Sequence, residues 1–182
     1  MDLKAAFSGK KVFLTGHTGF KGSWLLLILK ELGAEVKGYS LAPKSSADLY
    51  YQIDGGSMCD SVIADIRDKE RVKKELLEFD PDFVFHLAAQ ALVIDSYEYP
   101  VETFDTNVMG TIHVMDALRS LEKKCTTVLI TTDKVYENFE TTDLSSINAL
   151  ICGGAPVPVP LIKTYGERGV SFCQGYGLTE TA

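Results

Sequence analysis

Residues 12–25, VFLTGHTGFKGSWL, combine an apolar run with three evenly spaced glycines and the start of an amphipathic stretch. Gly16, Gly19 and Gly22 follow the pattern G-x-x-G-x-x-G. In a strand, loop and helix of this kind, the first glycine permits a sharp turn and the second lets a pyrophosphate approach the backbone. The third lets the helix pack closely against the strand. Because the helix N-terminus adds free N–H groups, we expect a dinucleotide-binding loop, with a plain packing turn as the alternative.

The alternation of short apolar runs with longer helical stretches continues along the chain. β-Branched residues are frequent in the short runs, which is typical of a parallel sheet with helices between its strands. The predicted fold is α/β, a single doubly wound Rossmann-like parallel sheet of about seven strands with helices on both faces. The predicted strands are 11–15, 35–40, 60–64, 82–87, 126–131, 148–152 and 170–174, and the predicted helices are 20–32, 47–53, 67–78, 99–120 and 157–167.

Composition and charge exclude several classes of partner. With 18 basic and 25 acidic residues, the chain has a formal net charge of −7, which argues against nucleic-acid binding. The longest apolar run, Trp24 to Leu29, is far shorter than the roughly 20 residues that span a bilayer. The N-terminus lacks an apolar signal core, so we expect a cytoplasmic protein without a membrane partner. The four cysteines show no metal-binding spacing, and no metal site is predicted.

The loops that follow the predicted strands hold further candidate ligand contacts. The second strand ends in Ser40, with Lys44 nearby and no acidic residue to bind a ribose 2′-hydroxyl, so the sequence leaves NAD and NADP both open. Asp65 is placed to contact adenine, or alternatively to cap a helix. His86 is expected to be a core histidine. The predicted cofactor contacts are Gly16, Thr18, Gly19, Phe20, Lys21, Gly22, Ser40, Asp65, Ile66, Leu87, Ala88, Ala89, Gln90, Asn107 and Thr131.

Residues of about 6 to 138 resemble the CDP-glucose 4,6-dehydratases of the extended short-chain dehydrogenase/reductase superfamily. The resemblance is carried by GKKVFLTGHTGFKGSWL, DIRD, FVFHLAAQALV, SYEYPVETFDTNVMGT and TTDKVYEN. It implies a tightly held NAD that oxidises C4 of a nucleotide-linked sugar, allows water to leave across C5 and C6, and returns the hydride. It also implies active-site roles for Thr132, with Asp133 and Lys134 as the acid and base of the elimination.

The chain departs from that family at residues the chemistry needs. A tyrosine followed four residues later by a lysine would take the sugar hydroxyl proton, since a nearby cation stabilises phenolate. No such pair follows residue 134, and Tyr136 and Tyr165 both lack a lysine at that offset. Where the family usually has Pro-Leu-Val-Arg, residues 91–94 are ALVI. The resemblance does not extend to the region that would enclose the sugar nucleotide. We therefore expect Thr132, Asp133 and Lys134 to be vestigial.

From about Asp143 the sequence resembles the adenylate-forming acyl-CoA synthetase superfamily. The resemblance is carried by GGAP at 153–156 and YGLTE at 176–180, and it implies contacts with adenine, phosphate and Mg²⁺ at an ATP site. That superfamily's phosphate loop, ribose-binding aspartate and C-terminal lysine domain have no counterpart here. We therefore interpret the segment as a strand, helix and strand that extend the parallel sheet.

The sequence thus predicts one Rossmann-like domain over 1–182, with a dehydratase-like part at 1–138 and a grafted part at 139–182. The leading hypothesis is an engineered or recombined chimera, monomeric or homodimeric, that retains affinity for NAD or NADP without turnover. One alternative is a residual NAD-dependent dehydratase, and another is a scaffold that binds no ligand.

Overall fold

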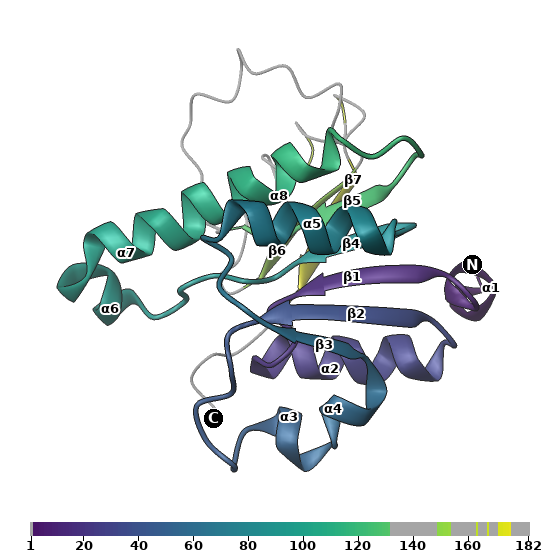
Figure 1. The fold of residues 1–182 in the computed structure, drawn as a ribbon, viewed down its shortest axis with the longest axis horizontal. Coiled ribbons are helices and arrows are strands. Elements are labelled where there is room, and N and C mark those ends of the chain that lie inside the picture. The colour runs from purple at the N-terminus through teal and green to yellow at the C-terminus, as the bar shows by residue number, and fades with distance from the viewer. Residues whose placement is uncertain (1, 132–148, 154–162, 164–166, 168–170, 176–182) are drawn as a thin grey trace. The chain divides into compact units, whose positions relative to one another are not determined.

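The computed structural model describes residues 2–131, 149–153, 163, 167 and 171–175 (Figure 1). The chain divides into two compact units, Met1–Thr127 and Val128–Ala182, which are described separately. The predicted helix at 157–167 lies mostly outside the described residues. The predicted single domain over 1–182 stays a prediction.

The main sheet has the strand order β3-β2-β1-β4-β5. Its strands are β1 (Lys11–Thr15), β2 (Glu35–Ser40), β3 (Asp60–Ile63), β4 (Phe83–His86) and β5 (Thr126–Leu129). β1 pairs in parallel with both β2 and β4, and its last residue, Thr15, lies opposite Tyr39 on one side and His86 on the other. The chain order reverses between β1 and β4, and in open α/β sheets ligands bind beyond the strand ends at this point.

Helices cover both faces of this sheet (Figure 1). α2 (Phe20–Glu31) lies on one face, and α5 (Lys69–Phe79) and α8 (Gly110–Leu118) lie on the other. The shorter elements are α1 (Leu3–Phe7), α3 (Leu49–Gln52), α4 (Gly55–Met58), α6 (Val93–Glu98), α7 (Pro100–Phe104) and a π-helix, η1 (Asp105–Met109).

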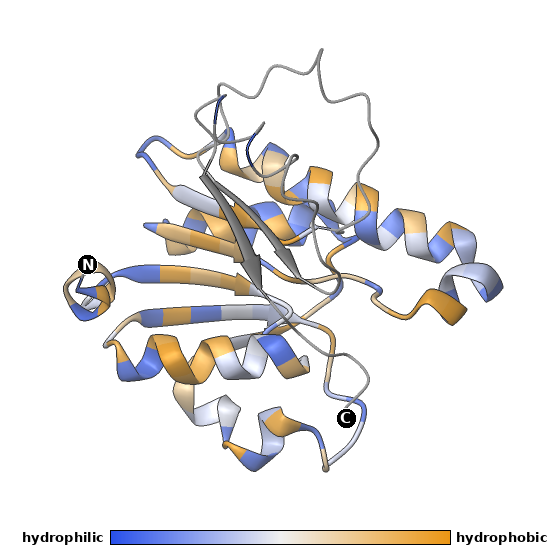
Figure 2. Cartoon of the chain, turned by 180° about the vertical axis from the view of Figure 1, so that it is seen from behind, coloured by the Kyte–Doolittle hydropathy of each residue, from blue (hydrophilic) through white to orange (hydrophobic). Residues whose placement is uncertain are grey.

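Alternate residues of β1 point into two hydrophobic cores. Val12 and Leu14 belong to the core that contains Leu26 and Leu29 of α2, and Phe13 belongs to the core of Leu76 and the other buried residues of α5 and α8. This alternation is the period of two expected for a strand covered on both faces. β1 is accordingly hydrophobic along most of its length (Figure 2).

The predicted α/β Rossmann-like architecture is confirmed, with one difference in strand number. The bounds of β1 and β2 match the predicted strands residue for residue. The predicted helix at 99–120 consists of α7, η1 and α8 in succession, and α1, α4 and α6 were not predicted. Among the described residues, no helix is both long and apolar enough to cross a membrane.

Among the residues that the structure describes, the main sheet has five strands instead of the predicted seven. β6 (Ala149–Gly153) and β7 (Ser171–Gly175) form a separate two-stranded parallel sheet, in which Ala149 lies opposite Ser171. The expected extension required a ladder between the grafted strands and the edge of the main sheet. Within the described part of the chain, β6 pairs with β7.

Candidate functional site

The loop after β1 turns sharply at Gly16, whose φ is +75°. Its N–H donates to the Tyr39 carbonyl at 2.9 Å, so the turn is fixed to β2. A Cβ atom at this position would lie 2.9 Å from the backbone nitrogen of Ala88, in the loop that follows β4. Only glycine combines this φ with such a close backbone neighbour.

Gly22 and Gly19 differ in what surrounds them. A Cβ at Gly22, in the first turn of α2, would overlap the Gly16 carbonyl oxygen and lie 2.7 Å from the carbonyl carbon. A Cβ at Gly19 would have one close neighbour, the Gly16 oxygen at 3.4 Å, which is ordinary van der Waals contact. The structure therefore needs glycine at 22 for packing, whereas the space beside Gly19 is open to a ligand.

The N-terminus of α2 has no side-chain cap. Gly19 is the N-cap residue, and Ser23 makes the first intrahelical bond, from its N–H to the Gly19 carbonyl at 2.8 Å. The N–H groups of the first turn have no partners within the helix, and the helix dipole gives this end partial positive charge. A phosphate at this position would receive hydrogen bonds from the backbone.

The glycine loop is tied to the end of β2 through Thr18. Its hydroxyl donates to the Leu41 carbonyl at 2.8 Å and lies 2.8 Å from the Ser40 hydroxyl, which donates to it in return. Thr18 is buried and Ser40 is half-buried. This connection joins the glycine loop to the carboxyl end of β2.

Asp65 follows β3 and forms an ion pair with Arg67. The Arg67 Nε lies 3.1 and 3.0 Å from the two carboxylate oxygens, and its Nη2 lies 2.6 Å from Oδ2. These bonds hold the pKa of Asp65 below its usual range. The alternative reading of Asp65 as a helix cap is wrong, because Asp68 caps α5 by accepting from the Arg71 N–H at 3.1 Å.

His86 is a core histidine, as predicted, at the end of β4. The Thr15 hydroxyl oxygen accepts from the N–H groups of Leu87 and Ala88, both at 3.1 Å, so its proton points to His86 Nδ1 at 2.7 Å. The tautomer that follows carries its proton on Nε2, which lies 3.0 Å from the Thr111 hydroxyl. Burial lowers the pKa of His86 to about 4, so its ring is neutral at pH 7.

The same hydrogen-bond chain continues into the π-helix. Thr111 donates to the Asn107 carbonyl at 2.7 Å. The Asn107 side chain then binds the backbone of Gln90 at two points, since its Oδ1 accepts from the Gln90 N–H at 2.7 Å and its Nδ2 donates to the Gln90 carbonyl at 3.0 Å. Asn107 thus positions the loop after β4 instead of lining the cleft.

His17, between Gly16 and Thr18 in the glycine loop, is fully buried. Its Nε2 lies 2.7 Å from the Ser61 hydroxyl, which accepts from the Tyr50 hydroxyl at 2.9 Å, and its Nδ1 has no partner in hydrogen-bonding geometry among the described residues. Burial lowers the pKa of His17 to about 4, with the Tyr39 backbone acting in the opposite direction. Its neutral ring packs edge-on against Tyr50, with ring centroids 5.4 Å apart.

These elements enclose a cleft of about 320 Å³ at the carboxyl ends of the strands. Nine of the predicted cofactor contacts line it: Gly16, Thr18, Gly19, Ser40, Asp65, Ile66, Leu87, Ala88 and Ala89. Phe20, Lys21, Gly22, Gln90 and Asn107 do not, and Thr131 belongs to the other unit. Thr132, Asp133 and Lys134 lie outside the described residues.

Eight further residues line the cleft and were not predicted as contacts. They are Leu41, Ala42, Pro43, Lys44, Asp48, Ala64, Arg67 and Thr106. Most of them follow the ends of β2 and β3 directly. Since ligands of open α/β sheets bind beyond the carboxyl ends of strands, position after a strand was the available signal.

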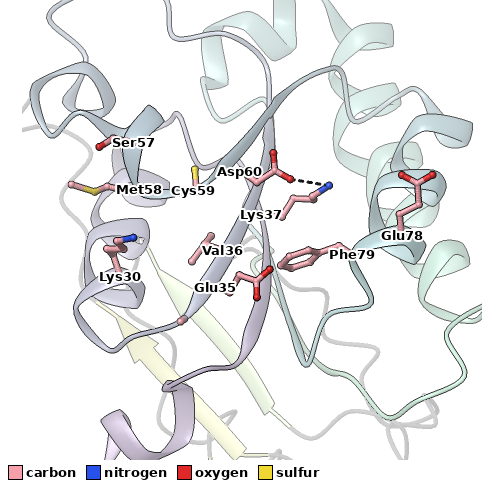
Figure 3. Close-up of a pocket in the computed structure, with 11 residues that line it drawn as sticks. Lys30, Glu35, Val36, Lys37, Ser57, Met58, Cys59, Asp60, Glu78 and Phe79 are labelled. Atoms are coloured by element: carbon pink, nitrogen blue, oxygen red, sulfur yellow. Dashed lines mark ion pairs between the residues drawn. The ribbon is translucent and has the colours of Figure 1, made fainter.

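A second cavity, of about 360 Å³, lies at the opposite end of the strands, where β2 and β3 begin (Figure 3). Two of its charged residues form an ion pair, since Lys37 Nζ lies 3.0 Å from Asp60 Oδ2, and Lys37 also lies 3.0 Å from Glu75 Oε2 outside the cavity. Within the described residues, none of the three glycines of the loop after β1 lines this cavity. The cleft beside Gly19 is therefore the candidate site.

The strand order and the glycine loop define the first unit as a Rossmann-type α/β domain. The chain belongs to the GDP-mannose 4,6 dehydratase family, whose model matches residues 13–146.

The relatives include a dehydratase, a protein of a different name and a solved structure that shares the fold. CDP-glucose 4,6-dehydratase of Salmonella typhimurium is 48% identical over 137 residues, which cover 75% of this chain and 38% of that protein. A feruloyl-CoA synthase of an Amycolatopsis species is 39% identical over 71 residues, 36% of this chain and 14% of that protein. A solved UDP-glucose-4-epimerase from Stenotrophomonas maltophila with bound NAD superposes with a TM-score of 0.62 at 22% identity, covering 79% of this chain and 52% of that one.

The chain thus spans about two fifths of the length of the dehydratase that it matches.

The contrast between Gly22 and Gly19 can be tested by adding one methyl group to each. Gly22→Ala places its Cβ against the Gly16 carbonyl, and overpacking of this kind costs about 1–3 kcal/mol or more. Gly19→Ala meets no such obstacle and should change the free energy of unfolding by less than about 1 kcal/mol. Urea unfolding followed by circular dichroism measures both, and equal losses at the two positions would contradict the packing described here.

The neutral ring of His86 predicts a loss of stability in acid. The folded state resists protonation down to about pH 4, whereas an unfolded histidine binds a proton near pH 6.5, so this stabilisation is complete above pH 6.5 and falls through that window. Between pH 7 and pH 5 the free energy of unfolding should therefore fall by about 2 kcal/mol because of His86. Over the same pH range, the free energy of unfolding of the His86→Gln variant should fall by about that much less than that of wild type. An NMR titration with a His86 midpoint near pH 6.5 would contradict the assignment.

Proposed function

We propose that this chain binds a nicotinamide dinucleotide, NAD or NADP, in the cleft beside Gly19. The observation that carries the proposal is the glycine loop: a positive φ at Gly16, close packing at Gly22, and open space at Gly19 in front of an uncapped helix N-terminus. This arrangement leaves backbone N–H groups free for a pyrophosphate. The small side chains of Ala88 and Ala89 on the far wall leave room for a flat ring.

The relatives support the same ligand class. The dehydratase that this chain resembles acts, by its name, on a CDP-linked sugar, and the epimerase with the same fold has NAD bound. A shared fold does not transfer an activity by itself, so the proposal is limited to the part of the site that this chain's own residues form.

We further propose that this chain does not complete hydride transfer on its own. Its 182 residues contain no Tyr-x-x-x-Lys pair after residue 134, so no phenolate with a neighbouring lysine is available to take the sugar hydroxyl proton. Neither Tyr136 nor Tyr165 is followed by a lysine four residues later. Thr132, Asp133 and Lys134 would then be remnants of a dehydratase site.

The sequence also supports an origin from two families, by recombination or by design. The dehydratase-like motifs end near residue 138, and the motifs from about 143 onward are those of acyl-CoA synthetases. The partial match to feruloyl-CoA synthase is consistent with this interpretation. In this proposal the second segment contributes strands β6 and β7 and no ATP-dependent chemistry.

Isothermal titration calorimetry with NAD tests the proposed binding. Wild type should bind with a measurable heat, and Gly19→Val should weaken binding at least about tenfold, because its side chain occupies the pyrophosphate position. Gly56→Val is the matched control, since Gly56 is exposed in α4 and its Cβ would have only the Tyr50 hydroxyl within 4 Å, at 3.8 Å.

Three outcomes separate the hypotheses. The absence of both heat and thermal stabilisation with millimolar NAD would contradict binding and favour a scaffold without ligands. Equal effects of the two valine variants would place the ligand elsewhere. Turnover of CDP-glucose that is lost in Lys134→Ala would contradict the proposed loss of catalysis and favour a residual dehydratase.

A further inference from the structure

The Thr15 hydroxyl group at the end of β1 uses every hydrogen-bonding position that it has. Its oxygen accepts from the N–H groups of Leu87 and Ala88, both at 3.1 Å, and its proton points to His86 Nδ1 at 2.7 Å. A hydroxyl offers one proton and two lone pairs, so none is left over. Thr15 and His86 are both buried, so bulk water does not replace a partner that is lost.

The two N–H groups belong to one wall of the cleft, which Leu87, Ala88 and Ala89 line. The Leu87 N–H is shared with the Thr15 carbonyl at 3.2 Å, whereas the Ala88 N–H is held by the hydroxyl. The backbone of this wall lies against the glycine loop, since a Cβ on Gly16 would be 2.9 Å from the Ala88 nitrogen. A shift of Ala88 therefore changes how the two loops face each other across the cleft.

His86 keeps the Thr15 proton in this direction only while its ring is neutral. A neutral imidazole has one acceptor nitrogen, which here is Nδ1, and Nε2 lies 3.0 Å from the Thr111 hydroxyl. A protonated ring would make Nδ1 a second donor. The Thr15 proton would then have to turn toward one of the two N–H groups of the wall, and that N–H would lose its lone pair.

Burial is the one cause of the lowered pKa of His86, which lies at about 4. β4 has no other titratable residue, and β5 has none. The titratable residues on and beside the other elements packed around the ring are Lys11 of β1, Asp105 of η1, His113 and Asp116 of α8, Cys125 before β5, and Lys69, Glu70, Arg71, Lys73, Lys74, Glu75 and Glu78 of α5. The hydrogen bond from Thr15 therefore has no charged competitor among them for Nδ1.

We propose that His86 is a positioning residue of the cleft, which acts through Thr15 to hold Leu87 and Ala88 in the wall and releases them when its ring is protonated. A proton on His86 and a dinucleotide in the cleft thus oppose each other. By linkage, each weakens the binding of the other by the same factor. This inference rests on the proposed function, because its ligand is the dinucleotide assigned to the cleft.

An NMR titration of wild type tests the coupling without any substitution. The amide signals of Leu87 and Ala88 should change with the same midpoint as the His86 ring, near pH 4, and saturating NAD should move that midpoint to lower pH. Amide signals that stay constant while the ring titrates would overturn the inference. A midpoint that saturating NAD leaves unchanged would overturn it as well.

Two substitutions separate the hydrogen bond from the volume of the ring. His86→Leu fills space without an acceptor, whereas His86→Asn places an acceptor oxygen near the position of Nδ1 and cannot be protonated. At pH 7, His86→Leu should weaken NAD about threefold or more and speed hydrogen exchange at the Ala88 amide, and His86→Asn should restore most of this loss. Val72→Ala, in the buried core of α5, is the control for lost stability and should change neither quantity.

The pH profile of binding gives a readout that packing alone does not change. At pH 4 about half of the His86 rings carry a proton, so wild type should bind NAD about twofold more weakly than at neutral pH. His86→Asn should lack this decrease. Because both proteins are measured at the same pH, the comparison also corrects for protonation of the ligand.

The outcomes separate this inference from the proposed function. Equal affinities of His86→Leu and His86→Asn, or a wild-type pH profile parallel to that of His86→Asn, would overturn the role of His86 and leave dinucleotide binding intact. Failure of wild type to bind NAD would overturn the proposed function, and with it the ligand half of this inference. The amide signals of Leu87 and Ala88 in the ligand-free protein would then decide the hydrogen-bond half by themselves.

Discussion

The backbone of α2 lies directly against the backbone of the loop that precedes it, and the rest of the site depends on this contact. A side chain at Gly22 would overlap the Gly16 carbonyl, so the approach exists only because position 22 has no Cβ. The approach sets the angle of the helix to β1 and directs its uncapped N-terminus at the cleft. It also leaves Gly19 as the one glycine of the three at which a Cβ would meet no atom closer than 3.4 Å.

A second constraint holds the opposite wall of the cleft. Thr15, His86 and Thr111 form a buried hydrogen-bond chain from β1 through β4 to the segment that includes the π-helix, and Asn107 extends it to Gln90. Every polar atom of the His86 ring has a partner, which compensates for burying the ring in neutral form. The two walls are therefore fixed by different physical means, close backbone packing on one side and a polar network on the other.

Sequence patterns located the strands and the glycine loop because those depend on local alternation and spacing. They could not locate the π-helix, because the spacing of apolar residues along it continues the spacing in α7 and α8. DIRD holds two aspartates, and the structure separates their roles: Asp68 caps α5 by accepting from the Arg71 N–H, whereas Asp65 pairs with Arg67. The strand count failed for a related reason: which strands pair across a sheet is a long-range property, and β6 pairs with β7.

The central claim is that the ligand lies on the glycine loop and between the two walls. Amide NMR spectra of the labelled chain, recorded while NAD is added, test this claim most directly. The account predicts that the largest shifts fall on residues 16–22 and 87–89, with little change at residues 30–37, which border the cavity at the other edge of the sheet. Shifts concentrated at 30–37, or the absence of any shift at 16–22 with saturating NAD, would contradict it.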